Sequence, residues 1–108
     1  QVASERFLYF RAGRKMVKVI LSGILFIESL KDYVKIATRK GQVITKQSTS
    51  SVEAMLPEEE FVRIHRSFIV SIKMIDSYTS TTICIGKSEL PIGPLYKHEI
   101  GKRLQVNL

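Results

Sequence analysis

The chain is divided into short runs of β-favouring residues that end in turns, and this division constrains its fold more than any other feature. The runs are rich in Val, Ile, Phe, Tyr and Thr, and turn-forming residues separate them. We expect strands over residues 7–10, 15–20, 25–29, 33–38, 42–46, 74–78, 82–85 and 88–91, and a strand, a bend and a further strand over 61–70. Runs of this length predict an all-β domain built from antiparallel hairpins.

The run at residues 33–38 indicates how the strands should face the core. Tyr33, Lys35 and Ala37 alternate with the apolar Val34 and Ile36. Successive side chains of a strand point to opposite faces of its sheet. We therefore expect Val34 and Ile36 to face inward.

Residues 50–57 depart from the strand pattern and predict a short central helix. Ser50 or Ser51 is suited to cap it, because a serine hydroxyl can accept a hydrogen bond from an amide of the first turn. Its apolar face is expected to consist of Val52, Met55 and Leu56. Pro57 should end this helix after about two turns.

A second helix is predicted over residues 94–104. Pro94 would lie in its first turn, where a missing amide hydrogen costs little. Leu95, Ile100 and Leu104 are spaced for one apolar face. No internal repeat or low-complexity linker divides the chain, so residues 1–108 are expected to form a single domain.

Charge narrows the class of partner. The chain has 17 Lys and Arg against 10 Asp and Glu, a formal net charge of +7. Basic residues gather in the first strands, whereas residues 58–60 are three glutamates. This excess implies an acidic partner, most commonly the phosphates of a nucleic acid, although membrane surfaces and acidic proteins stay open on charge alone.

Several kinds of chemistry are not indicated. Cys84 is the only cysteine, which excludes an internal disulfide and suits a reducing compartment. It lies in a β run and is expected to be a small buried hydrophobe rather than a nucleophile. His65, His98 and Cys84 fall in different segments, so we expect no metal site, and the scattered glycines predict no phosphate-binding loop. The sequence therefore predicts neither an enzyme nor a bound cofactor.

No apolar run approaches the length that a bilayer span requires. We expect a cytoplasmic domain that makes no membrane contact. The sequence also starts at Gln1 without an initiator Met, so we expect a part of a longer protein.

Residues 61–70 concentrate recognition groups between apolar anchors. The segment holds Arg63, His65, Arg66 and Ser67 between flanking Phe, Ile and Val residues. A guanidinium can donate two hydrogen bonds to O6 and N7 of guanine, and a hydroxyl can bind a phosphate oxygen. The structural alternative is a basic strand face in which His65 is a hydrogen-bonded structural residue.

This segment resembles the central motif of LytTR DNA-binding domains from bacterial transcription regulators, which reads like Phe-x-Arg-x-His-Arg-Ser-Phe-x-Val. The matching residues are Phe61, Arg63, His65, Arg66, Ser67, Phe68 and Val70. Further landmarks follow in the family's order at residues 24–29, 32–34, 56–57, 90–93 and 96–97. The resemblance spans about residues 7–104. It implies short antiparallel sheets that stack, in agreement with the strands, the short central helix and the short C-terminal helix expected above.

The resemblance also implies a function. Domains of this kind bind double-stranded DNA through loops rather than through a recognition helix. They usually form the output end of response regulators of two-component systems, often as pairs on repeated sites. We therefore expect a DNA-binding transcription-regulator domain that reads repeated sites, possible homodimers on DNA, and an input or receiver domain before Gln1.

The family's base-reading positions match three places in this sequence. The first is the loop from Lys31 to Tyr33, where the Tyr33 phenol can hydrogen-bond to a base or pack on a thymine methyl group. The second is Arg66, which His65 and Ser67 flank in the motif. The third is the turn that follows residues 90–91.

The third place departs from the family pattern. Relatives often carry a basic residue just after Ile-Gly, and this chain has Pro94 there. Because proline has no side-chain donor, we expect Lys97 to contact a phosphate instead. Arg14 and Lys15 are also expected to contact phosphates.

Two other classes of function stay open. A basic β-rich protein-interaction module could use the same face to bind an acidic partner without reading bases. A hydrolase is the more distant alternative, because no pair of nucleophile and base is evident.

Overall fold

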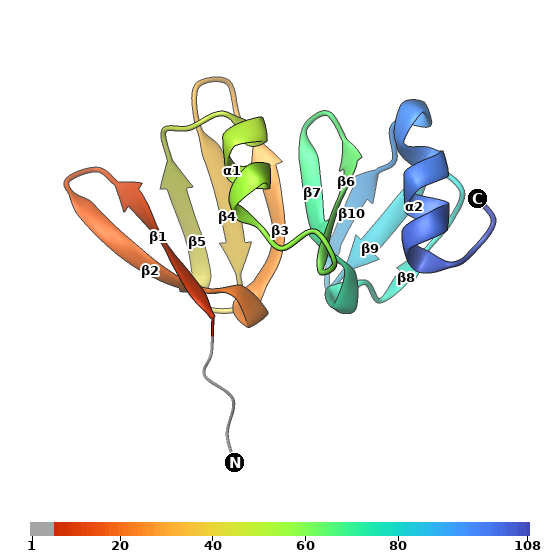
Figure 1. The fold of residues 1–108 in the computed structure, drawn as a ribbon, viewed down its shortest axis with the longest axis horizontal. Helices are drawn as coiled ribbons and strands as arrows, with labels where there is room; N and C mark the ends of the chain where they lie inside the picture. The colour runs from red at the N-terminus through yellow and green to blue at the C-terminus, as the bar shows by residue number, and fades with distance from the viewer. Residues whose placement is uncertain (1–5) are drawn as a thin grey trace, which may run out of the picture.

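The computed structural model describes residues 6–108 and confirms an all-β fold with short helices (Figure 1). Residues 1–5, which include the start without Met on which the expectation of a longer protein rests, lie outside the described residues. The strands are β1 (Phe7–Ala12), β2 (Lys15–Ile20), β3 (Ile24–Ser29), β4 (Val34–Thr38), β5 (Gly41–Thr45), β6 (Phe61–His65), β7 (Phe68–Ser71), β8 (Ser77–Tyr78), β9 (Thr82–Ile85) and β10 (Ser88–Pro91). The α-helices are α1 (Thr49–Met55) and α2 (Lys97–Leu104), and the 3₁₀ turns are η1 (Leu21–Gly23), η2 (Ile72–Met74) and η3 (Pro94–Tyr96).

The strands form three antiparallel sheets. β1 and β2 form a hairpin, and its turn places Gly13 at a φ of 66°, a conformation that glycine adopts without strain. The central sheet has the order β5-β4-β3-β7-β6, and the third sheet has the order β10-β9-β8. Figure 1 shows the hairpin on one side of the central sheet and the third sheet on the other.

The central sheet is apolar on both faces. Ile27 and Ile69 face a first core, which the β1–β2 hairpin and α1 complete. Phe26 and Val70 face a second core, which the third sheet and α2 complete. Since neighbouring residues of one strand are both buried, the sheet needs a covering layer on each side.

The prediction for the β4 strand is confirmed. Val34 and Ile36 are 1% and 0% exposed, and both belong to the first core. They lie on the face that the hairpin and α1 cover. The alternation that the sequence shows over residues 33–38 is thus the alternation between this core and the opposite side of the sheet.

Helix α1 begins earlier than predicted. Its N-cap is Ser48, not Ser50 or Ser51, and the Ser48 hydroxyl oxygen accepts a hydrogen bond of 3.0 Å from the amide of Ser51. Val52 is buried, as predicted, but Met55 is exposed. The buried residues within α1 are Thr49 and Val52.

The predicted C-terminal helix divides into two parts. Residues 94–96 form the 3₁₀ turn η3, and α2 begins only at Lys97. A 3₁₀ turn has fewer residues per turn than an α-helix, so it changes the angular position of its side chains. Ile100 is buried as predicted, whereas Leu95 is 94% exposed and does not contribute to the apolar face.

Two further predictions were wrong. The strand expected over residues 74–78 is too long, since Met74 ends η2 and only Ser77–Tyr78 form a strand, β8. Cys84, expected to be buried, is half-buried, because the buried side chains of β9 are Ile83 and Ile85 on the opposite face.

The position of the α1 cap generates a stability prediction. We expect Ser48→Ala to lower the free energy of unfolding by about 1 kcal/mol, because the Ser51 amide loses its acceptor. Ser50→Ala is the matched control, since Ser50 is exposed within the helix, and its effect should stay below about 0.5 kcal/mol. Urea denaturation followed by circular dichroism measures both, and a larger loss at Ser50 would show that the cap is misassigned.

Candidate nucleic-acid interface

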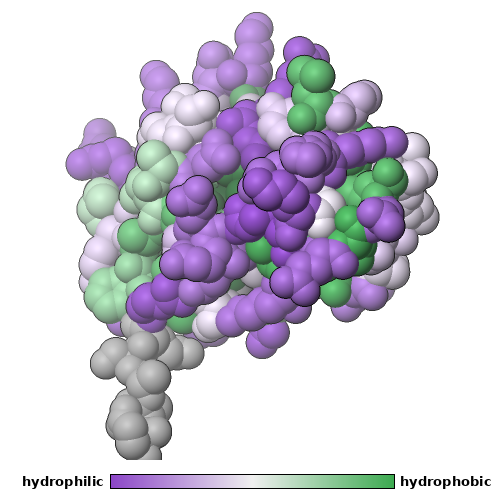
Figure 2. Space-filling view, turned by 45° about the vertical axis from the view of Figure 1, so that its right-hand side comes forward, coloured by the Kyte–Doolittle hydropathy of each residue, from purple (hydrophilic) through white to green (hydrophobic). Residues whose placement is uncertain are grey.

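Three connecting segments lie along one edge of the molecule, the upper edge of Figure 1. They are the loop of residues 30–33 between β3 and β4, the turn of residues 66–67 between β6 and β7, and the segment of residues 93–96 after β10. We call them the first, second and third loops. Figure 2 shows hydrophilic side chains projecting from this upper edge. The structure therefore brings together the three places that the sequence analysis selected.

Backbone hydrogen bonds join the three loops. The Ser29 amide, just before the first loop, donates to the Ser67 carbonyl of the second loop at 2.7 Å. The Gly93 amide of the third loop donates to the Ile64 carbonyl, just before the second loop, at 2.7 Å. The first loop is closed internally by a bond of 2.8 Å from the Leu30 amide to the Tyr33 carbonyl. These bonds fix the relative positions of the loops.

An irregularity in the central sheet makes the second of these bonds possible. The register between β6 and β7 shifts between Arg63 and His65, which indicates a β-bulge at Ile64. A bulged residue leaves the regular ladder, and here the Ile64 carbonyl accepts from Gly93 instead. Bulges occur often beside functional sites, where they change the direction of a side chain.

The second loop presents Arg66. Its side chain is exposed, whereas His65 and Ser67 on either side are half-buried. His65 Nδ1 accepts a hydrogen bond of 3.1 Å from the Ser67 amide, and the His65 ring lies 5.9 Å from the ring of Phe68. The imidazole thus supports the turn from the protein side, and the guanidinium of Arg66 is left accessible to a ligand.

The first loop is accessible over its whole length. Lys31, Asp32 and Tyr33 are exposed, and the Tyr33 side chain is 45% exposed. The next residue, Val34, is buried in the first core. Tyr33 is therefore anchored by its neighbour while its own ring is free to contact another molecule.

The third loop presents a residue that the sequence analysis assigned elsewhere. Leu95 is 94% exposed, although it was expected on the buried face of a helix. Pro94 is exposed beside it, and Lys97 is half-buried at the start of α2. Leu95 lies in the 3₁₀ turn η3, which begins at Pro94, and its side chain points to the surface from that turn.

Close packing holds the third loop against the second. A Cβ atom on Gly93 would lie 3.0 Å from Cδ2 of Tyr96 and 3.6 Å from Cα of His65. Any side chain at Gly93 would therefore crowd the Tyr96 ring. This packing and the Gly93–Ile64 hydrogen bond keep Leu95 near the turn that carries Arg66.

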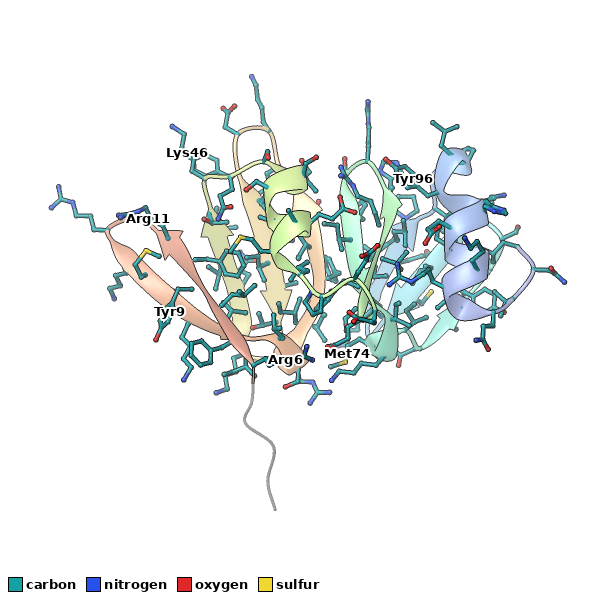
Figure 3. All side chains as sticks on the ribbon, viewed as in Figure 1. Arg6, Tyr9, Arg11, Lys46, Met74 and Tyr96 are labelled. Carbon is teal, nitrogen blue, oxygen red and sulfur yellow. The ribbon has the colours of Figure 1, made fainter. Side chains whose placement is uncertain are left out.

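Basic residues continue along the upper edge toward the hairpin. Arg14 and Lys15 are exposed at the turn between β1 and β2. Lys46, which follows β5, is also exposed at this edge, and Figure 3 shows it there together with Arg11 near the hairpin tip. The sequence analysis did not include Lys46, because its position on this edge depends on how β5 packs in the sheet.

The described part of the chain offers no cluster of three or more His, Cys, Asp or Glu side chains that could hold a metal ion. Within residues 6–108, no helix has the length and apolar character that crossing a membrane requires.

Comparisons with known proteins identify the family to which the sequence and the fold are similar. The sequence profile of the LytTr DNA-binding domain family matches residues 14–105. The sensory transduction protein LytT of Bacillus subtilis is 26% identical over 110 residues, which cover 96% of this chain and 46% of that protein. The transcriptional regulatory protein NatR of Bacillus subtilis is 36% identical over 59 residues, covering 55% of this chain and 25% of that protein. The chain thus spans less than half the length of these relatives.

A solved structure has the same fold. It is a LytTr DNA-binding domain from Bacillus cereus, which superimposes with a TM-score of 0.78 and 21% sequence identity. The match covers 94% of this chain and 98% of that chain. At this identity the similarity concerns the arrangement of strands and helices.

In the second loop, His65 supports the turn, whereas Arg66 is exposed to a ligand. We expect His65→Ala to lower the free energy of unfolding by about 1 kcal/mol, because the Ser67 amide loses its acceptor and Phe68 loses a packing partner. Arg66→Ala should change it by less than about 0.5 kcal/mol, since this side chain is exposed. Chemical denaturation of both variants without DNA tests the assignment, which equal losses would contradict.

Proposed function

This chain belongs to the LytTr DNA-binding domain family, and on this basis we propose that it binds double-stranded DNA sequence-specifically as the output domain of a bacterial transcription regulator. We further propose that the parent protein is a cytoplasmic response regulator of the two-component type, with an input or receiver domain preceding this one. The names of the relatives LytT and NatR, sensory transduction and transcriptional regulation, support this context. The domain itself acts by binding and not as an enzyme.

The observation that carries the proposal is the joining of three exposed loops on one basic edge. Specific readers of DNA place a few side chains at base edges and fix their register with phosphate contacts. Loops tied together by backbone hydrogen bonds meet this requirement, because their side chains approach the duplex with relative positions already set. Little conformational entropy is then lost on binding.

Each loop contributes different chemistry to base recognition. Arg66 offers a planar fork that matches O6 and N7 of guanine in the major groove. Tyr33 offers a phenol that can hydrogen-bond to a base or pack on a thymine methyl group. Leu95 offers only apolar contact, which suits a thymine methyl, and it follows Pro94, which stands where relatives often carry a basic residue.

Phosphate contacts come from residues around these loops. We assign them to exposed or half-buried basic side chains along the edge: Arg14, Lys15, Lys31, Lys46 and Lys97. We also assign a phosphate contact to the Ser67 hydroxyl, whereas His65 supports the turn by accepting from the Ser67 amide. These contacts position the protein without reading sequence.

A domain of this size would bury about 600 to 1,000 Å² on DNA, as single modules do. Such an interface gives modest affinity alone. Binding of two copies to repeated sites would raise the affinity, because the second copy binds beside the first. We therefore propose repeated target sites and pairing on DNA.

Selection of bound duplexes from a random pool tests the function as a whole. Enrichment of a repeated motif would support sequence-specific reading and give the spacing of the paired copies. A scrambled duplex that competes as well as the best selected site would favour a basic module that binds an acidic protein. A specific reader should prefer its site by about 10³-fold or more.

The basic edge predicts strong salt dependence. If about 4 to 7 phosphates are neutralised, the logarithm of affinity should fall with the logarithm of salt concentration with a slope of about −4 to −6. Fluorescence anisotropy on a labelled duplex at a series of salt concentrations measures the slope. Lys46→Ala should make it less steep by about one on every sequence. A nearly flat dependence would mean that the edge does not meet the DNA backbone.

Arg66 is predicted to read a base. Arg66→Ala should weaken binding to the selected site by about 1 to 3 kcal/mol and relax the preference at one base pair. Arg66→Lys is the sharper variant, because it retains the charge but loses the planar fork. Competition with duplexes that differ at single positions measures the preference. If lysine restores both affinity and preference, Arg66 is a phosphate contact only.

A further inference from the structure

The DNA-reading turn has a support on its protein side that the proposed function does not use directly. Arg63 lies in β6, and its side chain is 18% exposed. It belongs to the motif in the sequence, yet it does not project from the edge as Arg66 does. Its contacts are all within the protein, and they converge on the second loop and on α1.

The Arg63 guanidinium makes three polar contacts. Nε donates to the His65 carbonyl at 3.2 Å, and Nη2 donates to the Arg66 carbonyl. Nη1 donates to Glu53 Oε1 of α1 at 3.1 Å, which forms an ion pair. One side chain thus holds both carbonyls that bracket the backbone of Arg66.

These contacts give the Arg66 carbonyl a hydrogen-bond donor, which the two-residue turn does not provide by itself. Arg66 lies outside β6 and β7, so its carbonyl is not part of the ladder between them. A bonded carbonyl fixes the peptide plane that follows Arg66. The direction in which the Arg66 side chain leaves the turn depends on that backbone, so the contacts of Arg63 bear on base reading.

Glu53 sets the orientation of the guanidinium. Arginine has five donors in a rigid plane, so fixing one edge of the fork aims the other donors. With Nη1 held by Glu53, Nε and Nη2 face the two carbonyls of the turn. The ion pair also engages Arg63 within the protein, where it is not available as one more phosphate contact.

We propose that Arg63 is a positioning residue for DNA reading, which orders the turn of residues 66–67 through its carbonyls and is itself aimed by Glu53. The proposal rests on the proposed function for its effect on base preference. Its effect on the order of the turn can be measured without DNA.

Arg63→Lys is the main test variant. Lysine keeps the positive charge and the option of pairing with Glu53, but it cannot hold two carbonyls and a carboxylate in one plane. Glu53→Gln is the second variant, which removes the charge that aims Arg63 and leaves position 63 intact. It replaces the first if Arg63→Lys fails to fold.

Arg103→Lys is the matched control. Arg103 lies in α2, its side chain is 21% exposed, it pairs with Glu99 at 3.7 Å, and it donates to the Phe61 carbonyl at 3.0 Å. It therefore resembles Arg63 in exposure and bonding but contacts neither carbonyl of the turn.

Two readouts are compared for each variant. In the free protein, NMR order parameters of the Arg66 and Ser67 amides should fall in Arg63→Lys from about 0.85 to below about 0.6, and should not change in Arg103→Lys. On DNA, the ratio of affinities for the selected and scrambled duplexes should fall about tenfold in Arg63→Lys, with the affinity for scrambled DNA retained. Glu53→Gln should lower both the order parameters and the affinity ratio, each by less than Arg63→Lys does.

The outcomes separate the two proposals. A turn that stays as rigid in Arg63→Lys as in the control overturns the positioning role, whatever happens on DNA. A loosened turn with unchanged base preference overturns it as well, because the order of the turn is then not used in reading. If the chain without substitutions prefers no duplex over another, the proposed function fails. The order parameters alone then decide whether Arg63 orders the turn.

Discussion

Burial of the central sheet on both faces is the constraint on which the rest of the structure depends. Adjacent residues of β3 and β7, such as Phe26 and Ile27 or Ile69 and Val70, are buried on opposite sides. Each such side chain contributes about 1.5 to 3 kcal/mol when it is fully buried. A layer is therefore needed on each face, and the hairpin with α1 and the third sheet with α2 provide these layers. Because both faces of the central sheet are covered, only the loops at the ends of its strands are accessible to a partner.

Recognition at strand ends imposes its own requirement. Loops lose more conformational entropy than strands when they are ordered on a ligand, unless they are ordered beforehand. In this chain the loops are short, and Ser29, Ile64, Ser67 and Gly93 bond them to one another through backbone groups. The same sheet that forms the core thus fixes the edge that we propose contacts DNA.

The sequence predicts the strands well because alternation and turn residues are local signals. The errors arise where one element is placed by another. Ser48 caps α1 although Ser50 and Ser51 are equally suited by type, and Leu95 is exposed because η3 delays the start of α2. The proposed role of Arg63 is invisible in the sequence for the same reason. Its partner Glu53 is ten residues away in a different element, and no periodicity relates a helix to a strand that packs beside it.

The acidic residues are distributed so that the residues expected to give affinity for DNA differ from those expected to give base specificity. Glu28, Glu53, Glu60 and Glu99 pair with basic side chains of the protein, and Asp76 accepts from the Gly86 amide. Within the three loops, Asp32 is the single acidic residue. Few acidic side chains therefore oppose the positive charge at the edge where a phosphate backbone would lie. Several lysines and arginines share the attraction of phosphates, so the loss of one removes only part of it. In the proposed function, base discrimination depends instead on a few side chains whose directions the core determines, and there a substitute that keeps the charge does not keep the geometry.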